Sequence, residues 1–408
     1  MFNENWMALA AFAIGIGLLF QQQGLVSVAV LLVVTGGLGW LWSARSLRGV
    51  EYRRSFSEKR AFLGETVDMH LVAANHKPLP ISYLRIDDEC STGVTVLNGE
   101  VQVSTKPEVA LLSTVMSLRW FEKAEWHYQL RCERRGFFPF GPARLQSGDL
   151  FGLFRSCDER PLVEWLVVYP AIKPIRGLEL PSKEPLGDVR ADRRLFEDPN
   201  RTIGVRPYNW QDPLKRIHWT ATARRQTLQV RAYEPTTSHH LVIFLNMVTL
   251  PKYWQGTMPA LLEQVISIAA SVAAAASEMR LSVGLLANGC WPQSDQALKV
   301  LPSRSPDQLM HILEALAAIS VLSTISIEDL LLRESGRLPW GATVVVVSAS
   351  LSDELLAALV RLQAVGRRLV AIRLDNSPLP EGASKVRVLR ATDDGGAFSL
   401  LAEGGDLE

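Results

Sequence analysis

The amino end of the chain is a long apolar run without charge. Residues 6–42 contain no charged side chain, and only a Gln-Gln-Gln-Gly segment at residues 21–24 interrupts them. One helix of this length would measure about 55 Å, well beyond a hydrocarbon core of about 30 Å. We therefore predict a transmembrane helical hairpin over residues 1–44, with passes at residues 6–20 and 24–42. The first pass would cover only about 22 Å and must borrow flanking residues or thin the bilayer.

A cleaved signal peptide is the alternative interpretation of this run. The first five residues carry no basic side chain, and no small-residue cleavage site precedes a polar segment. These features favour a retained hairpin.

Basic residues gather directly after the second pass. Arg45, Arg48 and Arg53 lie there, whereas the turn at residues 21–24 is uncharged. The positive-inside rule then places the soluble domains in the cytoplasm, at the inner (plasma) membrane. Trp40 and Trp42 stand where an interfacial aromatic belt is expected, although they could equally pack against the partner helix.

Beyond the hairpin, the hydrophobic pattern changes twice. Short segments that alternate apolar and polar residues, such as 67–73 and 81–86, are separated by Asn, Pro and Gly turns and predict a β-sandwich over residues 50–170. Residues 171–235 lack such periodicity at their start and form a predicted connector and arm. From residue 236 to 408, apolar strands alternate with helical stretches, which predicts a doubly wound α/β domain with a mainly parallel sheet.

The predicted elements of the α/β domain can be stated with bounds. One stretch, residues 259–279, is apolar enough to resemble a further membrane span, but Glu263, Gln264 and its alanines and serines favour a buried helix. Ser305 followed by Pro306 is a typical helix start. The predicted segments are 240–245, 259–279, 281–287, 306–319, 327–333, 343–347, 353–365 and 368–374.

Composition excludes several classes of function. The 408 residues carry 43 basic and 42 acidic side chains, a net charge of +1, so no global field favours nucleic acid as a partner. The four cysteines form no C-x2-C pair, which disfavours a zinc cluster. We interpret them as reduced thiols, with a disulfide as the alternative that their spacing allows. The chain has no Walker A loop, no Rossmann Gly-x-Gly-x-x-Gly in context and no His-Glu-x-x-His helix.

The segment at residues 204–224 carries the pattern G-x-R-x-Y-x3-D-x4-I-H-W-x3-A-R. This pattern resembles the signature of the domain of unknown function 58 family, whose bacterial members are membrane-anchored and carry a von Willebrand factor A-like domain. Glycine and aromatic clusters before it, such as residues 135–142 and 148–154, resemble the β-rich region that precedes the signature in that family. The residues that carry the signature are Gly204, Arg206, Tyr208, Asp212, His218, Trp219 and Arg224, which we take as candidates for partner binding or for a structural role.

The resemblance also implies where a metal would bind. A von Willebrand factor A-like sheet holds a divalent cation through an Asp-x-Ser-x-Ser loop after its first strand. The matching positions here are Asn246, Val248 and Leu250, so the carboxylate and both hydroxyls are missing. Ser348 and Asp353 lie near a later strand without restoring the oxygen set. We therefore expect no metal and no cofactor.

Within the signature, Asp212 followed by Pro213 predicts a helix N-cap, with Leu214, Ile217 and Ala221 on one helical face. His218 and Trp219 lack a serine or cysteine nucleophile at a recognisable distance, which favours a packed histidine. The arginines of this region could form a basic strip that receives an acidic surface of another protein, or they could be solvated or pair internally with Asp212 and Glu234. They are Arg206, Arg216, Arg224, Arg225 and Arg231. We expect Arg206, Tyr208 and Trp219 to hold the arm against the sheet.

These observations predict a membrane-anchored, cytoplasm-facing scaffold or adaptor that is not an enzyme. Members of the resembled family commonly accompany MoxR-type AAA+ ATPases, which implies such a partner and a role in assembly or maturation of a membrane or envelope complex. Two alternatives stay open: a hydrolase that uses Asp212 and His218, and a cation-dependent adhesion module.

Overall fold

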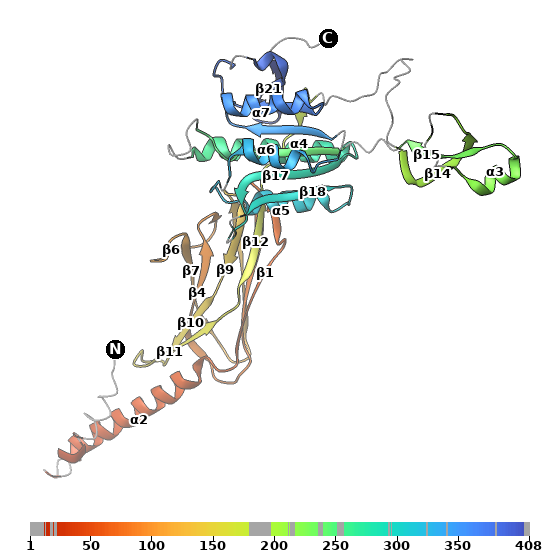
Figure 1. Cartoon of the computed structure of the whole chain (residues 1–408). Coiled ribbons are helices and arrows are strands. Elements are labelled where there is room, and N and C mark those ends of the chain that lie inside the picture. Colours follow the sequence, from red (N-terminus) through yellow and green to blue (C-terminus); the bar gives the residue numbers. More distant parts are fainter. Residues whose placement is uncertain are drawn as a thin grey trace. The chain divides into compact units, whose positions relative to one another are not determined.

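A computed structural model defines the fold (Figure 1). It divides into two compact units, Met1–Ala171 with Leu313–Ile319, and Ile172–Ile312 with Ser320–Glu408. The structure describes residues 12, 14–16, 19, 23–178, 197–210, 212, 217–235, 240–250, 257–292, 294, 296–323, 325–339, 342–379 and 382–403.

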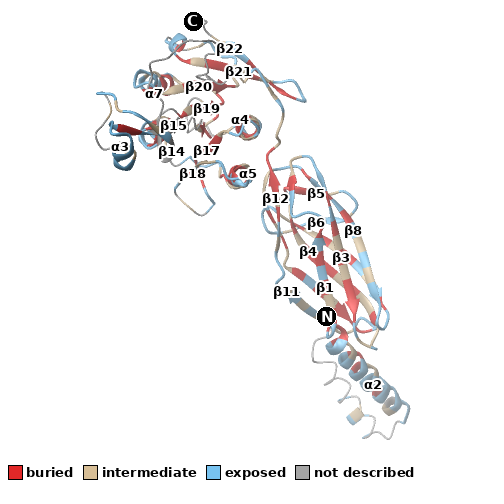
Figure 2. Ribbon diagram, turned by 90° about the vertical axis from the view of Figure 1, so that its right-hand side faces the viewer, coloured by how far each residue is buried: buried red, intermediate tan, exposed pale blue. Residues whose placement is uncertain are grey.

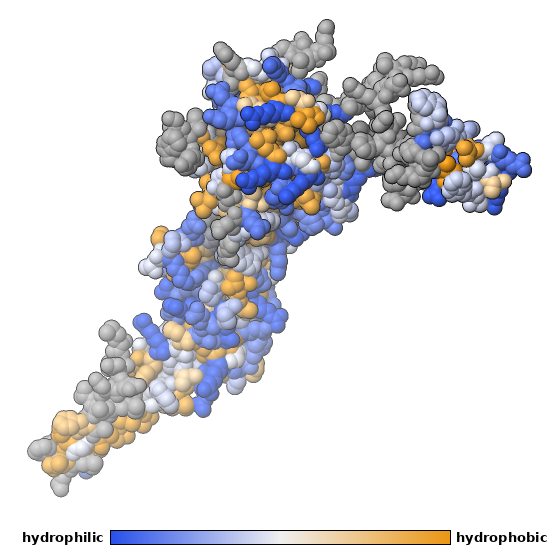
Figure 3. All heavy atoms as spheres, in the orientation of Figure 1, coloured by the Kyte–Doolittle hydropathy of each residue, from blue (hydrophilic) through white to orange (hydrophobic). Residues whose placement is uncertain are grey.

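The first unit begins with an apolar helix, α2 (Gln23–Ser46). Its segment Val26–Ser46 is long and apolar enough to cross a membrane, and only 22% of that apolar window is buried. Figure 3 shows the apolar surface that this helix exposes. The predicted second pass is therefore a helix, extended to Ser46. Most of the predicted first pass lies outside the described residues, so the hairpin stays a prediction.

Antiparallel strands make up most of the first unit. One sheet has the order β1-β3-β8-β5, a second has the order β11-β10-β4-β7-β6, and β12 joins β2 and β9 in a third. The strand bounds are β1 (Val50–Phe56), β2 (Arg60–Phe62), β3 (Thr66–Asn75), β4 (Ile81–Ser91), β5 (Val94–Val96), β6 (Val101–Val103), β7 (Val109–Leu118), β8 (Lys123–Cys132), β9 (Gly136–Phe140), β10 (Ala143–Gly148), β11 (Arg155–Arg160) and β12 (Glu164–Tyr169).

One apolar core is shared by strands of all three sheets. Met69 of β3, Leu84 of β4 and Leu166 of β12 belong to it, and each is fully buried. Alternation of buried and exposed residues along the strands places one face of each strand in this core, as the sequence pattern predicts.

A buried ion pair crosses this core between two sheets. Arg54 of β1 and Asp88 of β4 are each 2% exposed at the side chain, and Arg54 Nη1 lies 2.6 Å from both Asp88 carboxylate oxygens. Tyr52 Oη donates to Asp88 Oδ2 at 2.8 Å, and Arg54 Nη2 donates to the carbonyl oxygen of Phe140 at 2.6 Å. The Asp88 carboxylate and both Nη atoms of Arg54 therefore have the partners that burial requires, whereas Arg54 Nε is buried without one.

The second unit is built on an eight-stranded sheet, in the order β13-β22-β21-β20-β19-β16-β17-β18. The five strands from β21 to β17 in that order run parallel to their neighbours, whereas β18 and β22 pair antiparallel with β17 and β21. The bounds are β13 (Ile175–Arg176), β16 (His240–Leu245), β17 (Ser282–Cys290), β18 (Ala297–Ser303), β19 (Thr343–Ser348), β20 (Arg368–Arg373), β21 (Arg387–Asp393) and β22 (Phe398–Glu403).

Helices cover this sheet. Helices α6 (Ile327–Ser335) and α7 (Asp353–Ala364) share a core with Val242, Phe244 and Val346, which point to one face of their strands. Helix α4 (Pro259–Glu278) packs against β16, β17 and β19 and lies across the sheet from α7 in Figure 2. Helix α5 (Gln308–Ala318) begins in this unit, and its residues from Leu313 onward belong to the first unit. The predicted buried helix at residues 259–279 is therefore confirmed as α4.

A separate arm lies between β13 and β16 in the chain. Strands β14 (Glu197–Pro207) and β15 (Gln229–Pro235) pair antiparallel, and helix α3 (Trp219–Arg225) lies between them in sequence. Residues 179–196 of the predicted connector lie outside the described residues.

Candidate functional site

Three neutral polar side chains meet where parallel strands end. Asn246 follows β16, Asn288 lies near the end of β17, and Ser348 ends β19. The strands are neighbours in the sheet, so their carboxyl ends bring these residues together. In open α/β sheets this edge is where ligands bind, which makes it the first place to look for a site. We call Asn246, Asn288 and Ser348 the edge triad.

The edge triad is closed on itself by hydrogen bonds. Asn246 Nδ2 donates to Ser348 Oγ at 3.0 Å, and Asn288 Nδ2 donates to Asn246 Oδ1 at 3.0 Å. Asn246 Oδ1 also accepts from the backbone N–H of Val248 at 3.1 Å, and Asn288 Oδ1 accepts from that of Met247 at 2.7 Å. All three residues are buried. Each side-chain oxygen of the triad therefore already has a protein donor.

The hydroxyls of Ser348 and Thr249 at this edge also make hydrogen bonds to the backbone. Ser348 Oγ donates to the carbonyl oxygen of Ser350 at 2.7 Å, and Thr249 Oγ1 accepts from the backbone N–H of Met258 at 2.8 Å. Among the described residues, no group of three or more His, Cys, Asp or Glu side chains is placed to hold a metal ion. A hard divalent cation needs several free oxygens, and this edge offers bonded ones.

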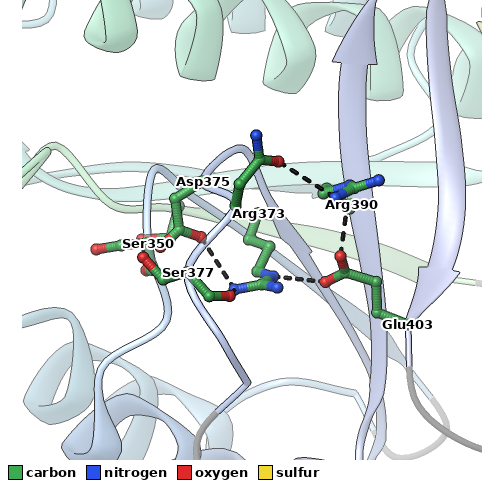
Figure 4. A network of polar contacts seen from close by, with 8 residues as sticks. Ser350, Arg373, Asp375, Ser377, Arg390 and Glu403 are labelled. Carbon is green, nitrogen blue, oxygen red and sulfur yellow. Dashed lines mark hydrogen bonds and ion pairs between the residues drawn. The ribbon is translucent and has the colours of Figure 1, made fainter.

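A charged network lies on the next strand along (Figure 4). Arg373 ends β20, pairs in register with Ser348, and is 5% exposed at the side chain. Its Nε donates to Glu403 Oε2 at 2.6 Å, and its Nη1 donates to the carbonyl oxygen of Ser377 at 2.6 Å and to Asp375 Oδ1 at 3.2 Å. Arg390 Nε lies 3.4 Å from Glu403 Oε1. The guanidinium of Arg373 thus links the end of β20 to Glu403 of β22 and to the loop that contains Asp375 and Ser377.

Sequence reasoning missed both Asn288 and Arg373. An asparagine and an arginine at the carboxyl ends of otherwise apolar strands were visible signals, since such positions face the ligand-binding edge.

Arg206 and Asp212 of the family signature are brought together in the arm. Arg206 Nη1 and Nη2 donate to the two Asp212 oxygens at 2.7 Å and 2.6 Å, a bidentate pair. Asp212 Oδ2 also accepts from the backbone N–H of Asn209 at 2.9 Å, and the backbone N–H of Tyr208 donates to the carbonyl oxygen of Leu228 at 2.9 Å. Internal pairing of the arginine, one of the two alternatives, is therefore what the structure shows. Gly204 lies in β14 with open space where a Cβ would stand.

The predicted helix start at Asp212 is wrong. Ile217 forms a bridge with Val230, and helix α3 begins at Trp219 with His218 as its N-cap. His218 Nδ1 accepts from the backbone N–H of Ala221 at 3.2 Å. The backbone N–H of Asp212 donates to the carbonyl oxygen of Asn209 at 2.8 Å and closes a turn. The Asp212 carboxylate is bonded within this turn, so it is not available to cap a helix.

Two further signature residues of the arm, Trp219 and Arg224, are exposed, and so is Trp210, which lies between Tyr208 and Asp212. Trp219 is 70% exposed. The predicted clamp by Arg206, Tyr208 and Trp219 stays a prediction. Trp210 is 81% exposed, and Arg224 lies exposed in the last turn of α3. Exposed tryptophans beside arginines are typical of binding surfaces, because both residue types are enriched among the anchors of protein interfaces.

Comparison with known proteins supports the resemblance in part. The family model described as "Protein of unknown function DUF58" matches residues 204–382, which include the arm from Gly204 onward, β16 to β20 and the edge triad. An uncharacterized protein, YeaD, from Bacillus subtilis (strain 168) is 21% identical over 314 residues, which cover 76% of this chain and 73% of that protein.

Solved structures resemble only part of the chain. The sporulation control protein Spo0M from Bacillus subtilis has a TM-score of 0.19 and 12% identity over 29% of this chain, and the match spans about half of Spo0M, 49%. A cohesin module from Clostridium perfringens has a TM-score of 0.20 and 10% identity, covering 29% of this chain and 96% of the module. No conclusion about fold or function follows from scores this low. The identified relationship is therefore that residues 204–382 match the DUF58 family, whose function is unknown.

Proposed function

We propose that this protein is a membrane-anchored protein-interaction scaffold or adaptor and that it does not turn over a substrate. Helix α2 is its anchor, the sheet unit is a von Willebrand factor A-like recognition domain, and the arm supplies contact residues. The observation that carries the proposal is the edge triad, whose oxygens are all bonded to protein donors. Because the triad's side-chain oxygens already have protein donors, the domain is suited to binding a partner through its outer surface.

The arm supports a protein as the partner. Trp210 and Trp219 are 81% and 70% exposed, and tryptophans of this exposure are the side chains that dominate binding energy when a partner covers them. The Arg206–Asp212 pair closes the turn that carries Trp210, so this part of the surface is held in place before binding. The family resemblance suggests a MoxR-type AAA+ ATPase as this partner. The basic residues after α2 favour a cytoplasmic location for it, at the inner membrane.

The test measures partner capture by the full chain in detergent. Wild type, Trp219→Ala and the control Trp291→Ala are compared with a purified MoxR-type ATPase, with and without ATP. Trp291 is 38% exposed and lies outside the arm, so it controls for a general loss of aromatic surface. We expect Trp219→Ala to weaken binding at least about tenfold, which corresponds to about 1.4 kcal/mol. Equal binding by all three proteins, or none by wild type, would remove the support for this partner and surface.

Two measurements separate the proposal from its alternatives. Titration calorimetry with Mg²⁺ and Mn²⁺ should give no binding that depends on Asn246, whereas tight binding abolished in Asn246→Ala would favour the adhesion module. His218→Ala should cost stability through the lost helix cap, by about 1 kcal/mol. A hydrolase would instead lose turnover with its fold intact.

A further inference from the structure

Three turns of the β-rich unit lie at the end where helix α2 enters it. Strand β1 starts at Val50, directly after the helix, and Val50 pairs with Asn75 at the end of β3. Ile81 pairs with Leu118 at the end of β7, and Ser147 of β10 pairs with Leu84. The registers therefore place the turns at residues 76–80, 119–122 and 149–154 beside the end of the helix.

The first and third of these turns contact helix α2 directly. Lys77 Nζ donates to the carbonyl oxygens of Arg45 at 2.9 Å and Arg48 at 2.7 Å, and also to that of Ser46. A Cβ at Gly39 would stand 3.2 Å from Asp149 Oδ2. The helix therefore contacts the third turn of the β-rich unit about two helical turns before Ser46, its last residue. Asp149 in turn accepts from the backbone N–H of Phe154 at 2.7 Å, which orders that turn.

The second and third turns expose large apolar side chains at their tips. Trp120 and Phe121 are 65% and 69% exposed, and Leu150 and Phe151 are 64% and 65% exposed. The backbone N–H of Phe121 donates to the carbonyl oxygen of Lys77 at 3.3 Å, so the second turn is tied to the lysine that caps the helix. An apolar groove of about 280 Å³ lies between the helix and the third turn, lined by Leu38, Leu41, Trp42, Leu79, Leu150 and Phe151 among others.

The depth of these tips follows from the helix. Val26–Ser46 has 21 residues and would span about 31 Å, close to the hydrocarbon core of about 30 Å. Leu150 and Phe151 line a groove with Leu38, Leu41 and Trp42, which lie well before the last residue of that span. A bilayer that surrounds α2 must therefore reach the third turn, while the second turn lies at the level of the helix end.

We infer that the turns at residues 119–122 and 149–154 insert into the bilayer interface as a second membrane contact. This inference rests on the proposed anchoring by α2. Lipid is the occupant because the tips continue the apolar surface of the helix, and because Arg45, Arg48 and Arg119 are exposed beside them to meet phosphate headgroups. Trp is enriched at this interface, and Trp, Phe and Leu are the side chains that interfacial segments bury at its acyl boundary.

The test places a fluorophore on each tip in the full chain. The exposed Cys157 is replaced by serine, and single variants Trp120→Cys, Phe151→Cys and Val103→Cys are labelled with an environment-sensitive dye and reconstituted in phosphatidylcholine vesicles. Val103 is 97% exposed and pairs with Ala110, eight residues from the membrane end of β7, so it is the matched control. Lipids that carry a doxyl quencher near the headgroup or along the acyl chain then report depth.

We expect at least a twofold quenching at positions 120 and 151 relative to position 103, with the acyl-chain quencher more effective at 151 than at 120. The inference would be overturned if either tip were quenched no more than position 103 in vesicles that carry the protein on flotation. That result would leave the proposed anchor intact. Failure of the protein to float with vesicles would remove the anchor and the inference together.

Discussion

At the scale of single residues, the buried pair Arg54–Asp88 is the costliest place to change the β-rich unit. Each side chain is 2% exposed, and the pair joins two sheets. Asp88→Asn leaves the guanidinium buried without its counter-ion, so we expect a loss of about 3–5 kcal/mol in the free energy of unfolding. Urea unfolding in detergent would measure it.

The control for that change is an exposed ion pair in the same unit. Lys106 and Glu89 lie 2.6 Å apart, with the lysine side chain 59% exposed. Lys106→Ala should cost at most about 1 kcal/mol. Similar losses for the two variants would contradict a special role for the buried pair.

Thiol reactivity provides a second residue-scale test. Burial raises the pKa of Cys90 and of Cys132 to about 11, so both are neutral thiols at pH 8. Cys290 is also buried, whereas Cys157 is exposed. Iodoacetamide under native conditions should modify Cys157 at least ten times faster than the other three, as read by mass spectrometry of peptides. Comparable rates at Cys90 would contradict the burial of that core.

At the scale of elements, the edge triad holds three strand ends in one arrangement. Asn288→Ala removes the acceptor of the Met247 N–H and a donor to Asn246, both in a buried setting. We expect a cost of about 1–3 kcal/mol, because buried polar groups lose their partners. Thermal unfolding would measure it, with Ser323→Ala, an exposed change in the same unit, as the control.

The ion pair Lys173–Asp393 ties the chain before β13 to β21 in a pH-dependent way. The hydrogen bond from Lys173, 2.7 Å from a carboxylate oxygen, holds the pKa of Asp393 below its ordinary value. The carboxylate therefore contributes stability above the ordinary pKa of about 4, and this contribution is lost as the pH falls through the lowered pKa.

Replacing that carboxylate gives the matching prediction. Asp393→Asn should cost about 1 kcal/mol at pH 7, since the pair is partly exposed. The difference from wild type should shrink below pH 4. A difference that stays constant from pH 7 to pH 3 would show that the charge is not its source.

Regular elements were the most predictable part of the molecule. Residues 240–245 and 259–279 were expected as a strand and a helix and form β16 and α4, because long apolar patterns constrain the element type. The arm was less predictable: the pattern around Asp212 fits a helix locally, but the bidentate contact with Arg206 and the Ile217–Val230 bridge decide otherwise. The antiparallel strands β18 and β22 carry polar residues among their apolar ones, so the hydrophobic pattern did not predict them.

At the scale of the whole molecule, Lys77 couples helix α2 to the β-rich unit. Its amine donates to three carbonyl oxygens at the end of the helix, where a cation also meets the negative end of the helix dipole. Lys77→Met should speed hydrogen exchange at the Val50 amide, which donates to the Leu47 carbonyl at 3.3 Å, by about tenfold. Mass spectrometry of the peptide that covers residues 47–52 in detergent would detect it. Unchanged exchange would assign the coupling to the third turn alone.

Helix α4 has a consequence for how the chain is made. Its 20 residues pass the same length and hydropathy criteria as α2, yet 61% of its apolar window is covered, much of it by strands β17 and β19, which are synthesised after it. While it leaves the ribosome, this segment is therefore uncovered and competent for the membrane insertion machinery. Correct topology therefore requires the sheet to cover α4 before a translocon inserts this helix into the membrane. Variants that delay sheet formation should increase the fraction of protein in which α4 is inserted into the membrane.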